Sequence, residues 1–422
     1  MIVRCIVIAA LALPSFGETT SRPIRLQEYL DLVAQTNLDL AASRFNVTVA
    51  EAQISVAKVI PDPSVNGGPS TVNGLGAPVT WSLGVSETIE LGGKRGARID
   101  VANHGKSLAQ AQLDDFFQTL RVNATNAFID ALAARQVLDR KRRTLESVEK
   151  LVAATEQRLR VGDVSPTVLW QVKVEAERFR SEVITAEGDV HAADYALEFF
   201  IGSEKAGPMG QLQPAGDLLL APRTFDAEVL VRDALERRTD LLVSLRSAAV
   251  AQAQVKVARS NRWIDLSLGA DWARTSAATG EFATIAPSLP FDSRGFSVGF
   301  PLPFSKLQHG ELDAARATAA QAEVQTQSAR RHVEIEVRQA LARYEATRRS
   351  VAVYTGEILA NADRAVDATR YSYERGAARL IELLDAQRTV DDVYLSYITA
   401  LSDNAKALVA LERASARWDV QF

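Results

Sequence analysis

Side chains that could bind a metal ion or carry out catalysis are few in this sequence and widely separated. The histidines have none of the short spacings that bring two imidazoles onto one metal ion; they are His104, His191, His309 and His332. Two methionines cannot build a thioether site, and no set of nucleophile, base and acid stands out. The sequence therefore predicts a protein that is not an enzyme and that uses no cofactor and no metal site of its own.

The segment Gly92-Gly-Lys-Arg-Gly96 is weakly similar to a phosphate-binding loop. Such a loop needs a glycine five residues before Gly93 and a serine or threonine after the lysine. Thr88 and Arg95 occupy those two positions instead. We interpret the segment as a tight turn from a strand into a helix, with cations at a membrane interface.

The composition favours long helices over a compact globular core. The chain has 422 residues, with Lys+Arg 48 against Asp+Glu 52, so it lacks both the basic surface of a nucleic-acid-binding protein and the acidity of a disordered tail. Aromatic residues make up only 7% of the chain. Helices that pack on small side chains have this composition.

Residues 1–17 have the pattern of a secretory signal, with Arg4 followed by the apolar run Cys5–Leu13. A buried helix or a membrane anchor is the alternative, but the run is too short to span a bilayer of ~30 Å. Cys5 is the only cysteine and does not lie at the cleavage site, so we expect a mature chain without disulfide or acyl anchor. No apolar run of membrane-spanning length follows, so insertion would require strands of a closed barrel.

The mature chain consists of two repeats with the same order of parts. Gly96 and Gly162 bound a stretch of 66 residues, and so do Gly310 and Gly376. We therefore divide the chain into a first repeat over 18–205, a linker over 206–225 and a second repeat over 226–422. Each repeat should contain a helix, a strand pair, a very long helix and a closing helix.

The long helices are expected over 94–161 and 308–375, and the closing helices over 166–201 and 379–417. At 1.5 Å per residue each long helix would reach roughly 100 Å. Apolar and small residues follow a heptad spacing: it runs from Leu113 to Leu159 with a break at Lys141, from Val333 to Ile358, and from Leu380 to Leu408 with Asp391 skipped. An ordinary two-stranded coiled coil and a larger helical assembly both fit this spacing, and the many Ala and Thr seam positions favour the larger assembly.

The strand pairs are expected over 61–91 and 263–302, where apolar residues alternate with small polar ones. The apolar members are Trp81, Leu83, Val85, Ile264, Leu266, Leu268, Trp272, Phe296, Val298 and Phe300. Both a membrane barrel strand and a half-buried soluble sheet show this alternation. Because a closed barrel needs at least about eight strands, four strands predict pairing with further copies of the chain.

Three segments in this order and spacing resemble the TolC family of outer-membrane efflux proteins, and its CzcC-type branch in particular: Glu87–Arg98, Arg160–Pro166 and Tyr373–Gln387. The resemblance covers nearly the whole mature chain. It implies a mainly helical protein with a membrane β part. Three copies would form a homotrimer, with twelve strands as a barrel in outer-membrane lipid and twelve helices as a long periplasmic tunnel. A periplasmic adaptor and an inner-membrane RND-type pump would dock at its tips, and the pump would supply the energy.

The resemblance also assigns roles to residues at the two helix-hairpin tips. The residues expected to contact the adaptor are Arg160, Gly162, Asp163, Arg375, Gly376 and Arg379. By position, Glu382 and Asp385 match two acids that ring the narrow entrance, and their i, i+3 spacing puts both on one helix face. Three copies would stack two carboxylate rings, which favour cations. A plain solvated helix face remains the alternative.

Tyr373 and Thr167 match polar residues that latch the two tips together in the closed state of the family. Val168 stands where an acid is expected and Ala378 where a base is expected, so this latch departs from the family pattern. The leading function is an exit duct for small solutes or heavy-metal cations. The alternatives are the exit duct of a type I protein-secretion system and a periplasmic coiled-coil adaptor.

Overall fold

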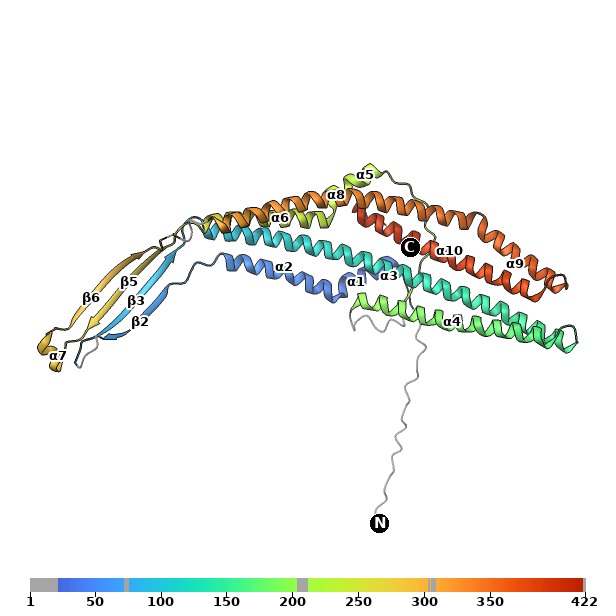
Figure 1. Cartoon of the computed structure of the whole chain (residues 1–422), viewed down its shortest axis with the longest axis horizontal. Helices are drawn as coiled ribbons and strands as arrows, with labels where there is room; N and C mark the ends of the chain where they lie inside the picture. The colour runs from blue at the N-terminus through green and yellow to red at the C-terminus, as the bar shows by residue number, and fades with distance from the viewer. Residues whose placement is uncertain (1–21, 72–75, 203–211, 303, 305–308, 420–422) are drawn as a thin grey trace, which may run out of the picture.

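The computed structural model describes residues 22–71, 76–202, 212–302, 304 and 309–419. The expected signal, residues 1–17, and part of the expected linker lie outside the described residues. The described chain is elongated, with a sheet at one end, two helix hairpins at the other and long helices side by side between them (Figure 1). None of its described helices combines the length and the apolar character that crossing a membrane would require.

The described residues of the first half form seven elements. They are β1 (Arg22–Ile24), α1 (Leu26–Thr36), α2 (Leu38–Ala57), β2 (Ser64–Thr71), β3 (Val79–Ile89), α3 (Lys94–Arg160) and α4 (Pro166–Ile201). The second half follows the same plan with a few additions. Its elements are β4 (Leu212–Pro214), α5 (Ala227–Arg237), α6 (Thr239–Ser260), β5 (Leu266–Thr275), α7 (Gly280–Ile285), β6 (Phe291–Gly299), α8 (Gly310–Val353), the π-helical turn η3 (Tyr354–Ile358), α9 (Leu359–Glu374) and α10 (Leu380–Ser415).

The sequence did not predict the short parallel pairing of β1 with β4, which ties the start of the chain to the segment between the two halves. Nearby, the Tyr29 hydroxyl donates to the Leu197 carbonyl at 3.2 Å. The Asn37 side chain donates to the Phe200 carbonyl at 2.8 Å and caps α2 by accepting from the Leu40 N–H. These bonds seat α4 end to end with α2, so both helices lie along α3 (Figure 1).

The long helix α3 has 67 residues, and its predicted seam is buried. Ala124 and Ala131 are fully inaccessible to solvent. The helix ends where Gly162 adopts a positive φ of 79°, and Gly376 ends α9 in the same way with a φ of 76°. Helices commonly end at a glycine in the left-handed conformation, because its N–H bonds to a carbonyl of the last turn and the chain then changes direction. Pro166 then occupies the first turn of α4, where a missing N–H does no harm.

The second long helix departs from the prediction of one uninterrupted helix over 308–375. The π-helical turn η3 separates α8 from α9, and the ribbon bends at this place (Figure 1). A π-turn inserts one residue into the helical repeat. After buried Val351 the next buried residue of this helix is Val366, fifteen residues later. Two uninterrupted heptads would span fourteen residues, so the spacing contains one extra residue. The predicted seam residues Tyr354 and Ile358 are only half-buried.

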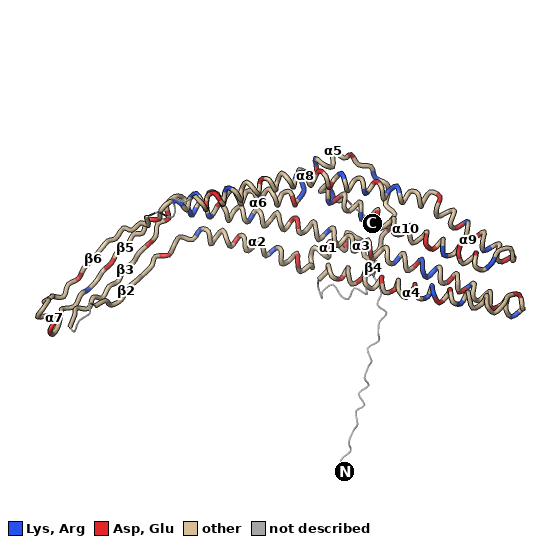
Figure 2. The backbone as a smooth tube through the Cα atoms, viewed as in Figure 1, with Lys and Arg blue, Asp and Glu red and all other residues tan. Residues whose placement is uncertain are grey.

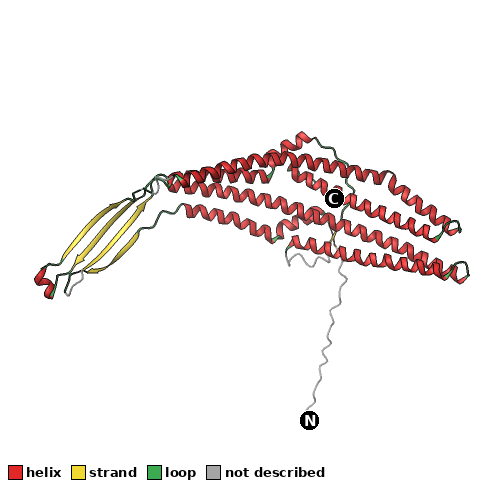
Figure 3. Ribbon diagram, viewed as in Figure 1, coloured by secondary structure: helices red, strands yellow, loops and turns green. Residues whose placement is uncertain are grey.

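The sheet is antiparallel in the order β2-β3-β5-β6 (Figure 3). Directly paired residues share a face, and the register Leu83↔Trp272 and Ala270↔Phe296 aligns the predicted apolar residues of three strands on one face. We call this the apolar face. It is exposed in the single chain: Trp81 is 60% and Phe296 92% accessible. The opposite, polar face carries mainly Ser, Thr and Gly.

Two predicted strand residues, Ile264 and Phe300, lie just outside the strands. Ile264 precedes the first ladder pair, Ile89↔Leu266, because the chain is still turning out of α6 there. Phe300 follows the last pair, Ser267↔Gly299. Pro301 comes next and has no N–H to donate to a ladder.

Candidate functional site

The two hairpin tips lie at the end of the molecule farthest from the sheet (Figure 1). In the first tip, Arg158 donates from Nε to the Asp163 carboxylate at 2.6 Å, while Arg160 and Gly162 are exposed. In the second tip, the Arg375 guanidinium lies 4.1 Å from the centre of the Tyr371 ring. The tips thus present exposed cations and tight glycine turns at the far end of the helices.

Glu382 and Asp385 lie in the first two turns of α10, and both are exposed, with side chains 51% and 62% accessible. Glu382 accepts from the Arg379 N–H at 3.3 Å and so caps the helix. Asp385 lies 3.5 Å from Arg388. The neighbours Leu383 and Leu384 point into the protein and are buried. The two acids therefore lie on the solvent-exposed face of α10.

The structure places Tyr373 and Thr167 in different surroundings. Tyr373 is buried in an apolar cluster with residues of α3, α4 and α10, and Arg158 lies 5.3 Å over its ring. Thr167 is exposed, and within the described part of the chain no hydrogen bond joins it to Tyr373. Val168, in the place of the expected acid, packs on the same apolar cluster. Within the described chain, the two tips pack against each other through this apolar cluster.

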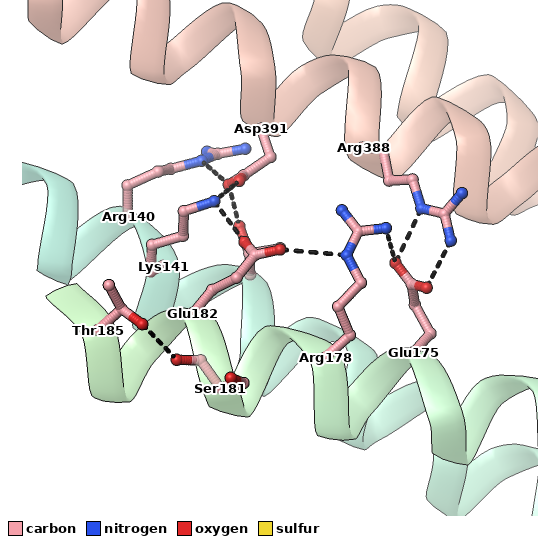
Figure 4. Close-up of polar contacts among 10 residues, drawn as sticks. Arg140, Lys141, Glu175, Arg178, Ser181, Glu182, Thr185, Arg388 and Asp391 are labelled. Atoms are coloured by element: carbon pink, nitrogen blue, oxygen red, sulfur yellow. Dashed lines mark hydrogen bonds and ion pairs between the residues drawn. The ribbon is translucent and has the colours of Figure 1, made fainter.

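A buried ion pair links α4 to α10 behind the tips. Arg388 donates to both oxygens of Glu175, from Nε at 2.9 Å and from Nη2 at 2.5 Å (Figure 4). The Glu175 carboxylate is nearly inaccessible. Hydrogen bonds from Arg388, opposed in part by burial, hold the pKa of this carboxyl below its usual value. This planar, bidentate pairing joins two helices that belong to different hairpins.

A second buried carboxylate, Asp391, collects donors from α3. It accepts from Thr144 Oγ1 at 2.7 Å, from Lys141 Nζ at 2.8 Å and from Arg140 Nε at 3.3 Å. Lys141 also donates to Glu182 of α4 at 2.6 Å, so α3, α4 and α10 meet at one ammonium group (Figure 4). Burial lowers the pKa of Lys141, but its hydrogen bonds to Asp391 and Glu182 outweigh burial and raise the pKa overall.

Arg178 connects the two pairs, because it lies 3.2 Å from Glu182 and 3.5 Å from Glu175. The resulting network balances four cations with four carboxylates; its charged members are Arg140, Lys141, Glu175, Arg178, Glu182, Asp385, Arg388 and Asp391. Sequence reasoning did not find it. The signal was present, however, since Lys141 and Asp391 are the two breaks in the heptad seams.

The strand-to-helix junction uses the cations of Gly92–Gly96 within the protein. Lys94 is buried and lies 2.6 Å from both oxygens of Asp265. Arg95 donates to the Lys58 carbonyl at 2.8 Å, and Arg98 pairs with Glu90 through both carboxylate oxygens. The segment is therefore a structural turn that joins β3, α2 and the β5 side of the sheet. Elsewhere too, the described His, Cys, Asp and Glu residues form no group of three that could hold a metal ion.

The profile of the outer membrane efflux protein family matches residues 29–203 and again residues 230–417. The chain belongs to this family. The double match confirms the tandem repeat, and it excludes the alternative of a periplasmic adaptor. The chain is thus an outer-membrane efflux channel protein of the kind that works in tripartite systems, with a long periplasmic helical extension, and its family is non-enzymatic.

Individual relatives agree with this assignment. The chain is 26% identical over 404 residues to the cobalt-zinc-cadmium resistance protein CzcC of Cupriavidus metallidurans, covering 96% of this chain and 93% of that protein. It is 22% identical over 401 residues to the outer membrane protein TolC of Salmonella enteritidis, covering 92% and 80%. Its fold matches a crystal structure of CusC with a TM-score of 0.74 at 18% identity, covering 96% and 95% of the two chains.

Removing Arg388 should loosen the tips. In Arg388→Ala the Glu175 carboxylate stays buried without its bidentate partner. A fully buried pair broken in this way costs ~3–5 kcal/mol, and since Arg388 is 36% accessible we expect about 2 kcal/mol. Hydrogen exchange of the amides in α4 and the first turns of α10 should speed up accordingly.

The matched control is Arg180→Ala. Arg180 lies on the exposed side of α4 and pairs with Glu177 of the same helix and with Glu149 of α3. It should leave exchange unchanged. Adding Glu175→Gln to Arg388→Ala should restore part of the protection by removing the buried charge. Equal exchange rates in the Arg388 and Arg180 variants would show that the bidentate pair does not hold the tips.

Proposed function

We propose that three copies of this chain form a passive exit duct through the outer membrane. The observation that carries the proposal is the sheet order β2-β3-β5-β6, which leaves β2 and β6 without a second partner within the described chain. In lipid, unpaired strand edges are not tolerated. Copies of the chain can satisfy them by pairing β6 of one with β2 of the next, and three copies give twelve strands, as the family resemblance implies.

The cargo that we propose is a heavy-metal cation or another small cationic solute. The CzcC protein, similar over nearly its whole length, is named for resistance to cobalt, zinc and cadmium. Glu382 and Asp385 are exposed on one face of α10, so three copies would place six carboxylates around the entrance. Such rings attract cations. The duct itself supplies no energy, which must come from an inner-membrane pump of the RND type.

A periplasmic adaptor is the partner that we propose for the tips. Arg160, Arg375 and Arg379 are exposed there, and the Arg379 side chain is 85% accessible. Exposed cations on rigid turns suit an acidic or amide-rich partner surface. Gly162, Asp163 and Gly376 would shape the same surface without providing positive charge.

The mass of the native particle tests the trimer. The full-length protein, extracted in detergent from a density-separated outer-membrane fraction, should have three times the mass of the chain in native mass spectrometry. A particle of two copies would fit an eight-stranded arrangement and would contradict the trimer. A protein recovered only from the soluble periplasm would overturn the duct.

Ion selectivity tests the entrance acids. The double variant Glu382→Ala, Asp385→Ala should lower the cation-to-anion permeability ratio several-fold, because two carboxylate rings disappear from the narrowest part of the path. Reversal potentials in planar bilayers under a salt gradient measure the ratio. Glu146→Ala is the control, since that acid is exposed on α3 beside Lys150. An unchanged ratio in the double variant would remove the acids from the entrance.

Adaptor contact is tested by charge reversal at the second tip. Arg375→Glu and Arg379→Glu should reduce the yield of crosslinks to the adaptor, because each replaces an attractive charge by a repulsive one. Arg330→Glu, on the exposed side of α8 away from the tips, should crosslink as well as the unchanged protein. Full crosslinking of the tip variants would place the contact elsewhere.

A further inference from the structure

We propose that Arg274 of β5 and Arg294 of β6 form a binding site for the phosphate groups of anionic lipid in the outer leaflet. The inference rests on the outer-membrane location of the chain and on the register of its sheet. It does not depend on the cargo or on the adaptor.

Both arginines lie on the apolar face of the sheet. The register pairs Trp81 with Arg274 and Trp272 with Arg294, and directly paired residues point to the same side. This is the side that carries Leu83, Val85 and Phe296. Charged side chains are dense along the helices and sparse along the strands (Figure 2). The charged residues of the apolar face in β2, β3, β5 and β6 are Glu87, Arg274, Asp292 and Arg294.

The arginines lie toward the outer end of this face. The helices are periplasmic, so the strand ends near α7 are the extracellular ends (Figure 1). Arg274 lies eight residues beyond Leu266, where β5 begins at the helical side. Eight residues of a strand tilted by ~40° rise about 20 Å, which is close to the height of the apolar band of a membrane β protein. A cation is strongly disfavoured at mid-membrane and tolerated at the interface.

Two neighbouring tryptophans also indicate that the arginines lie at the level of the lipid headgroups. Trp81 is the ladder partner of Arg274, and Trp272 is the ladder partner of Arg294. Both tryptophans are exposed. Exposed tryptophans on a lipid-facing surface gather at the level of the headgroups. Among the described strand residues of this face, the charged one nearest the helical end is Glu87, which pairs with Leu268 in the ladder, whereas both arginines lie nearer the other end.

The two guanidinium groups can reach one phosphate. Arg274 and Arg294 occupy diagonal positions on neighbouring strands, where the backbone positions are ~7–8 Å apart and long side chains meet. A guanidinium binds phosphate oxygens in a bidentate manner, with stronger hydrogen bonds than a neutral donor makes. Two such groups side by side match a phosphate monoester better than they match a zwitterionic headgroup.

Neighbouring carboxylates do not neutralise the positive charges of Arg274 and Arg294, so both guanidinium groups can bind phosphate. Asp292 lies 3.9 Å from Arg274, but both side chains are exposed, 52% and 67% accessible, and an exposed pair of this length is weak. No ion pair of Arg294 is found among the described residues. On the apolar face β2 carries Val65, Gly67, Pro69 and Thr71, so a neighbouring copy that paired β2 with β6 would bring no carboxylate from that strand to Arg294.

The test uses the full-length detergent-purified protein with lipid A that carries both phosphates, and with the same lipid after removal of both phosphates. Native mass spectrometry counts the retained lipid. The unchanged protein should retain the phosphorylated lipid and release the dephosphorylated one. Arg274→Gln with Arg294→Gln should weaken retention about tenfold, as expected when charge-assisted hydrogen bonds to phosphate are lost.

A second variant keeps the proposal testable if the double variant fails to assemble. Asp292→Asn removes the carboxylate that competes for Arg274 and should strengthen retention of the phosphorylated lipid several-fold. Arg330→Gln, on α8, should change nothing, and millimolar inorganic phosphate should not displace the lipid. Equal retention of the two lipids by the unchanged protein, or unchanged retention in both the arginine and the Asp292 variants, would overturn the site.

Discussion

Close packing along α3 is the constraint on which the rest of the structure depends. This one helix contacts α2, α4, α6 and α10, so it must offer a narrow surface to neighbours on several sides. Small buried residues such as Ala111, Ala124 and Ala131 make this possible, because they let helix backbones approach each other. Large side chains such as Phe128 and Tyr29 pack against each other in the middle of the molecule, where α1 and α5 add to the core, and Phe179 and Tyr373 are buried near the tips. The low aromatic content of the chain is a consequence of this packing.

Where the two hairpins meet, ion pairs and hydrogen bonds occupy positions that apolar side chains fill elsewhere along the helices. Lys141 and Asp391 occupy seam positions that other heptads fill with apolar residues. Lys141 pairs with Asp391 of α10 and Glu182 of α4, and Asp391 also accepts from Thr144 and Arg140 of α3. Replacing a buried ion pair by apolar residues is often neutral for stability, so such a network is better explained by specificity. Its hydrogen bonds join α3, α4 and α10 at one level of the molecule. The apolar cluster around Tyr373 then holds the tips together below it.

The sheet is built for surroundings that the single chain does not provide. Its apolar face is exposed, and each of its two outer strands lacks a second partner within the described chain. A solvated single copy would leave both features unsatisfied. The ion pair of Lys94 with Asp265 ties the β5 side of this sheet to the start of α3. Membrane part and periplasmic part are thus one continuous structure.

The sequence alone determined the long helices and the paired strands, because periodicity and turn residues act over neighbouring positions. The equal spacing of Gly96–Gly162 and Gly310–Gly376, the buried seam and the alternation of the strands were all readable in this way. Tertiary structure decided what depends on distant partners. The ends of the strands at Leu266 and Gly299, against the predicted Ile264 and Phe300, follow from where the ladder finds partners. The π-turn after Val351 interrupts a helix whose local sequence predicts no break. Lys141 meets Asp391 across 250 residues, and no local pattern records which distant charge lies opposite.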